Sequence, residues 1–79
     1  MLFDLKEVPK PFLTLGRNIA RLRSGCGITQ ERLAEMADIH PRYLQKLEAG
    51  VTHPSLVVLC RIKTALDCEW NELLRGLPS

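Results

Sequence analysis

Residues 28–50, ITQERLAEMADIHPRYLQKLEAG, constrain the fold more than any other stretch, because they predict two short helices with almost no connection between them. The helices are expected over residues 29–37 and 41–49, and both fall below the ~12–15 residues at which an isolated helix becomes stable in water. Packing against the rest of the chain must therefore hold them. A joint of three or four residues forces a steep crossing, so the second helix projects one face outward in a fixed orientation.

Local signals mark where the two helices begin and end. Thr29 is a good N-cap, and Ile28 and Leu33 stand at the spacing of a hydrophobic staple across the first turn. Pro41 suits the first position of the second helix, where a missing N–H group costs nothing, and Gly50 suits its end.

The joint also predicts how the two helices pack. Ala34 is small enough for a close crossing, Ile39 fills the turn, and Leu44 and Leu47 pack back toward the first helix. Glycine usually supplies such a turn, but Asp38 can replace it because aspartate tolerates the left-handed backbone better than most residues.

The N-terminal part of the chain divides into an arm and a helix. Residues 1–12, with Pro9 and Pro11, show no helical period and are expected to form an extended arm that either docks or frays. Residues 13–79 form the predicted domain. Its first helix starts at an N-cap, Thr14, stops at Gly25 or Gly27, and has an inward stripe of Leu15, Ile19, Leu22 and Cys26.

Two more helices follow residue 54. Ser55 caps the first, whose expected buried row is Leu56, Leu59, Ile62 and Leu66. The second spans residues 69–75 and carries a core set of Trp70, Leu73, Leu74 and Leu77. No stretch alternates long enough for a strand, so the fold class is all-α, with five compactly packed helices.

Composition narrows the functions that such a domain can perform. Seventy-nine residues leave room for one core, and deep substrate clefts are hard to build at that scale, so no enzyme is expected. The three cysteines, Cys26, Cys60 and Cys68, lack the spacing of a zinc site; reduced thiols in a cytoplasmic protein are expected, with Cys60 and Cys68 as small buried hydrophobes. No catalytic set, cofactor loop or membrane-length apolar run is present in the sequence.

The segment TQERLAEMADIHPRYLQKLEAG resembles the helix-turn-helix of the phage repressor and Cro family, the XRE-like regulators. LGRNIARLR, PSLVVLCRIKTALDC and EWNELL resemble the first, fourth and fifth helices of that family, so the resemblance covers roughly residues 13–75. It implies a lambda-repressor-like domain, with the helix-turn-helix at helices two and three. It also implies a sequence-specific regulator that binds double-stranded operator DNA, with helix 41–49 in the major groove, most simply as a homodimer.

The resemblance assigns roles by position. Base contacts fall on the outward residues of the recognition helix, which are Pro41, Arg42, Gln45 and Lys46. Phosphate contacts fall on Gln30, His40, Thr52 and His53, although His40 can equally be a helix cap and His53 part of a solvated loop. Arg23 and Glu48 match a structural ion pair of the family. No metal, cofactor, small-molecule substrate or membrane contact is implied.

Two departures from the family pattern bear on affinity. The loop after the recognition helix, VTHPS, lacks the usual lysines and arginines, and residues 28–53 carry a net charge of −1. Lys63 stands where a small apolar residue is common, so it either snorkels or alters the packing of the last helix. The expectation of DNA binding therefore rests on pattern and geometry.

Two other functions stay open. The same fold can serve as a protein-interaction module, such as an antitoxin-like or anti-repressor partner, and the slightly acidic motif favours that alternative. The chain could also be the targeting head of a larger effector, which the start at Met1 and the ending RGLPS disfavour. The sequence leaves open the operator, the direction of regulation and any effector. The dimer surface is also open, with residues 1–12 and 69–75 as candidates.

Overall fold

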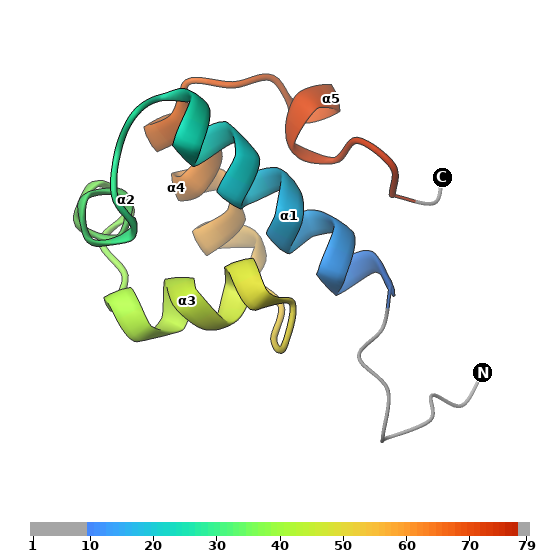
Figure 1. Ribbon diagram of the computed structural model, residues 1–79, viewed down its shortest axis with the longest axis horizontal. Coiled ribbons are helices and arrows are strands. Elements are labelled where there is room, and N and C mark those ends of the chain that lie inside the picture. Colours follow the sequence, from blue (N-terminus) through green and yellow to red (C-terminus); the bar gives the residue numbers. More distant parts are fainter. Residues whose placement is uncertain (1–9, 78–79) are drawn as a thin grey trace.

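The computed structural model describes residues 10–77, which form five helices and no strand (Figure 1). The helices are α1 (Lys10–Gly25), α2 (Gln30–Ala37), α3 (Pro41–Ala49), α4 (Leu56–Leu66) and α5 (Trp70–Leu73). This arrangement confirms the all-α prediction and the two short helices around residue 39. None of the described helices is long and apolar enough to cross a membrane.

The first helix begins earlier than the sequence predicted. Thr14 is not its N-cap, because α1 already includes Lys10, Pro11 and Phe12. Two prolines made this region look extended, yet Pro11 lies in the first turn, where backbone N–H groups have no partner within the helix. Residues 10–12 of the predicted arm are thus helical, and residues 1–9 lie outside the described residues.

The aliphatic core joins one face of every helix. Its fully enclosed large side chains are Ile19, Leu33, Leu44, Ile62 and Leu73. Ala34 is completely buried, as expected for a residue at the crossing of α2 with its neighbours. Because α2 and α3 are so short, this shared core supplies the stability that they lack as isolated helices.

Several residues predicted to be buried are at the surface instead. Leu56 is 74% exposed and Trp70 39% exposed, and Cys26 and Cys60 are also exposed; of the three cysteines only Cys68 is buried. Leu56 is the first residue of α4, well before the buried Ile62 and Leu66, and Cys26 lies beyond the end of α1, where the helical period no longer applies. A helix period predicts one stripe, but it does not say how far other elements cover it.

The positions of Trp70 and Lys63 are related, because their side chains contact each other. The Lys63 ammonium lies 5.3 Å from the centre of the Trp70 ring, so the indole supports a cation–π contact at the surface between α4 and α5. The unusual lysine therefore reaches past the core and packs on the last helix, one of the two outcomes expected from the sequence.

The close approach of α1 to α3 requires glycine at position 16. A Cβ atom there would lie 2.4 Å from the Leu47 carbonyl oxygen and 2.7 Å from that of Glu48. Gly16 therefore lets the backbone of α1 rest directly on the last turns of α3. That contact places α3 at the edge of the fold with one side free, as Figure 1 shows.

Candidate functional site

The joint between α2 and α3 has the geometry that its sequence indicates. Asp38 adopts a left-handed conformation with φ of 56°, and the Ile39 N–H group donates to the Ala34 carbonyl oxygen over 2.9 Å. The Thr29 hydroxyl accepts from the Arg32 N–H group at the start of α2. The Thr29 bond caps the start of α2, whereas the Asp38 conformation and the Ile39 bond end the helix and fix the direction in which α3 leaves.

The outer face of α3 carries the residues expected to read bases. Arg42, Gln45 and Lys46 are all exposed and stand at i, i+3 and i+4, so they form one stripe. Leu44 and Leu47 point the opposite way and are buried. Pro41 is half-buried at the start of the helix, at the edge of this stripe.

An ion pair locks α3 against α1. The Arg23 guanidinium donates to both Glu48 carboxylate oxygens, from Nε over 2.7 Å and from Nη2 over 3.1 Å. The side chains are only 17% and 6% exposed, respectively. The hydrogen bond with Glu48 raises the pKa of Arg23 above its ordinary value, so this arginine stays charged.

Arg23 also holds the start of α2. Its Nη1 donates over 2.9 Å to the carbonyl oxygen of Ile28, just before Thr29. A planar guanidinium presents several donors in a rigid fork, so one side chain ties together the end of α1, the start of α2 and the end of α3.

Gln30 joins the same network, which the sequence did not indicate. Its Nε2 donates to Glu48 Oε1 over 2.9 Å. A side-chain amide nitrogen has two N–H groups, so one remains for a phosphate oxygen. The predicted phosphate contact at Gln30 is thus held in place by the carboxylate that orients α3.

His40 caps α3. Its Nδ1 accepts a hydrogen bond from the Arg42 N–H group over 3.0 Å. In the neutral ring the proton must then sit on Nε2, which makes that atom a donor. The two roles expected for His40, cap and phosphate contact, are therefore compatible.

The loop after α3 is braced from two sides. The His53 ring lies 5.0 Å from the Phe12 ring, centre to centre, and the Tyr43 hydroxyl donates to the His53 carbonyl oxygen over 3.2 Å. His53 is exposed and Thr52 is half-buried. Neither Phe12 nor Tyr43 was singled out from the sequence, and only contacts between distant segments identify them.

The predicted site residues lie on α2, on α3 and on the turn and loop beside α3, which hydrogen bonds connect through Gln30–Glu48 and Tyr43–His53. Gln30 belongs to α2, His40 to Lys46 belong to the turn and α3, and Thr52 and His53 belong to the following loop. Within residues 10–77, no group of three or more histidine, cysteine or acidic side chains is placed to hold a metal ion. The arrangement offers cations, amides and a helix start, which suits a polyanion with readable edges.

Comparisons with known proteins agree with this geometry. A helix-turn-helix family model matches residues 19–73. An uncharacterized HTH-type transcriptional regulator, y4dJ, from Sinorhizobium fredii is 35% identical over 60 residues, which cover 76% of this chain and 78% of that protein. The crystal structure of the restriction-modification controller protein C.AhdI from Aeromonas hydrophila superposes with a TM-score of 0.78 at 32% identity, covering 82% of this chain and 98% of that one.

Proposed function

The chain belongs to the helix-turn-helix family of transcriptional regulators, and on that premise we propose that it occupies an operator with α3 in the major groove. The observation that carries the proposal is the locked orientation of α3. Gly16, the Arg23–Glu48 pair and Gln30 fix its inner side, while its outer side stays open. A groove about 12 Å wide accepts a helix presented in this way.

The base-reading set is Pro41, Arg42, Gln45 and Lys46. Arg42 and Lys46 can donate to guanine O6 and N7, and Gln45 can pair with adenine N6 and N7. Pro41 offers an apolar surface at the start of the helix, where a thymine methyl group would fit. Each good bidentate contact discriminates against a wrong base by roughly 1–3 kcal/mol.

The phosphate-contacting set is Gln30, His40, Thr52 and His53. Gln30 stands at the start of α2, where free backbone N–H groups and the helix dipole favour an anion. His40 has an Nε2 donor, and Thr52 and His53 occupy the braced loop on the other side of α3. These groups bracket the recognition helix and would set its register on the duplex.

We further propose that two copies bind together, with their α3 helices about 34 Å apart on half-sites one helical turn from each other. A single short helix contacts few base pairs, and a symmetric pair doubles the sequence that is read. The protein would act in the cytoplasm, on DNA, without catalysing a reaction.

Selection of duplexes from a random pool tests this function directly. We expect enrichment of a palindrome, and a steep loss of affinity as salt rises, because each neutralised phosphate contributes a slope of about −0.9 in log K against log salt. Failure to enrich any sequence, together with no retention on DNA at low salt, would refute the proposal and favour the protein-interaction module.

Single substitutions then separate the two residue sets. Arg42→Ala and Gln45→Ala should lose the preference for the selected site over scrambled DNA, whereas Gln30→Ala should weaken binding to both. Arg32→Ala is the matched control, because Arg32 is exposed on α2 and pairs with Glu35. Equal specificity in the Arg42 variant and the control would show that α3 does not read bases.

A further inference from the structure

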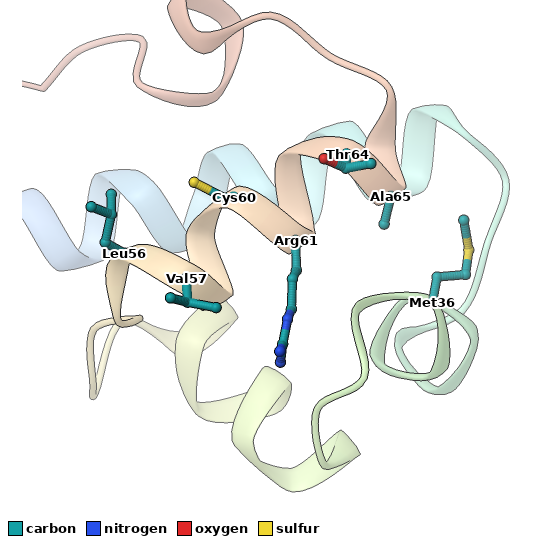
Figure 2. A pocket seen from close by; sticks show the side chains of 7 residues that line it. All are labelled: Met36, Leu56, Val57, Cys60, Arg61, Thr64 and Ala65. Carbon is teal, nitrogen blue, oxygen red and sulfur yellow. The ribbon is translucent and has the colours of Figure 1, made fainter.

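Apolar side chains gather on a surface that the proposed DNA contacts do not use. Met36 is 43% exposed, Leu56 74% and Val57 60%, and all three line one groove between α2 and α4. Figure 2 shows Met36 on α2 across from Arg61 and Ala65 of α4, and Cys60, farther along α4, also lines the groove. The groove has a volume of about 730 Å³. Contiguous exposed apolar surface of this kind marks a binding site.

Arg61 sets the charge that an occupant must carry. Among residues 10–77 it is the one charged side chain that lines the groove, and it extends from α4 between Val57 and Met36 (Figure 2). The ion pairs of residues 10–77 are Arg23–Glu48 and Arg32–Glu35, so Arg61 has no carboxylate partner in the described chain. The groove therefore fits apolar side chains accompanied by a carboxylate.

The chain itself holds a segment of that chemistry. Residues 1–9, MLFDLKEVP, contain the apolar side chains Leu2, Phe3, Leu5 and Val8 and the carboxylates Asp4 and Glu7. A second copy of the groove would instead present another Arg61 and no acid, so it complements the site less well.

The segment is also attached near the groove. Residue 9 precedes α1, and Phe12 in the first turns of α1 contacts the ring of His53. His53 stands three residues before Leu56, the first residue of α4 and of the groove. Nine extended residues span up to ~30 Å, whereas the 11-residue α4 is only about 16 Å long. The segment can thus run along the whole groove from its tethered end.

We propose that residues 1–9 fold back within the same molecule and occupy the groove between α2 and α4. Their apolar side chains would cover Met36, Leu56 and Val57, and Asp4 or Glu7 would face Arg61. The proposal is independent of DNA binding, because the groove shares none of the residues assigned to bases or phosphates.

The reactivity of the Cys60 thiol measures whether the groove is occupied, because Cys60 lines the groove and is exposed in the described structure. The experiment uses the full chain with Cys26→Ser, which removes the other exposed thiol, and measures the rate of Cys60 alkylation by N-ethylmaleimide with mass spectrometry. If the segment is docked nine-tenths of the time, only about one-tenth of the molecules present the thiol. Replacing Phe3 and Leu5 with serine should then raise the rate about tenfold.

Lys6→Ser is the matched control within the same segment, and it should leave the rate unchanged. Arg61→Glu should speed alkylation, and adding Asp4→Lys and Glu7→Lys to it should restore protection. Equal rates in the parent and the Phe3→Ser, Leu5→Ser variant overturn the proposal. So does protection that disappears on dilution, since that result assigns the groove to a second copy. Circular dichroism confirms that each variant retains its helices.

Discussion

Removal of the Arg23 side chain tests the idea that a buried ion pair holds the recognition helix in place. In Arg23→Ala the Glu48 carboxylate, 6% exposed, loses two donors and keeps only the Gln30 amide. Breaking a buried pair by removing one partner typically destabilises a protein by ~3–5 kcal/mol, because an uncompensated charge stays in a poorly solvated place.

That cost is large for a domain of this size. At roughly 0.05–0.15 kcal/mol per residue, 79 residues correspond to a total stability of about 4–12 kcal/mol. We therefore expect Arg23→Ala to lose between about a quarter and all of the free energy of unfolding, depending on where the parent protein lies in that range. Glu48→Ala should cost less, because Arg23 is 17% exposed and keeps its bond to the Ile28 carbonyl oxygen.

Urea unfolding followed by circular dichroism measures these differences, and a double-mutant cycle isolates the pair. The coupling energy between Arg23→Ala and Glu48→Ala should reach about 2–3 kcal/mol, near the upper end for residues in contact. It should also change little with added salt, because shielded charges are weakly screened. A coupling below about 0.5 kcal/mol would refute the reasoning and make the two residues independent solvated charges.

Three further predictions follow from single positions. Gly16→Ala should destabilise the protein by about 1–3 kcal/mol in the same urea assay, because the added Cβ atom would meet the α3 backbone. Gly25→Ala is the control and should not destabilise it, because the added Cβ atom has no described atom within 4 Å. Equal effects of the two substitutions would contradict the packing argument. Asp38→Gly should leave stability unchanged or raise it by up to about 1 kcal/mol, whereas Asp38→Val should lower it by about 1–2 kcal/mol, since the position is left-handed. Burial raises the pKa of the Cys68 thiol above its ordinary value of 9.0, so the unfolded chain loses this proton at lower pH than the folded one. Stability should therefore fall as the pH rises past 9.0, and Cys68→Ala should show a shallower fall in its urea midpoint; identical slopes would show that the thiol does not contribute.

The sequence determined the local architecture around the recognition helix. Caps and left-handed turns act within four residues of their own position, so the sequence alone predicts them. They are Thr29, Asp38, His40, Pro41 and Gly50. The resemblance added the Arg23–Glu48 pairing, and the structure contains it. The roles of Arg42, Gln45 and Lys46 in reading bases remain predictions.

Only the tertiary structure decided which faces are covered. Helical periodicity placed Leu56, Cys26 and Trp70 on apolar stripes, but within residues 10–77 no other element buries them. The contacts of Gln30 with Glu48 and of Phe12 with His53 join residues 18 and 41 positions apart, and no local pattern encodes such partners. Burial and long-range contacts depend on how whole helices pack, whereas caps and turns depend on a few neighbouring residues. For that reason the chain alone revealed how α3 begins and ends, and the packed fold revealed what holds it in place.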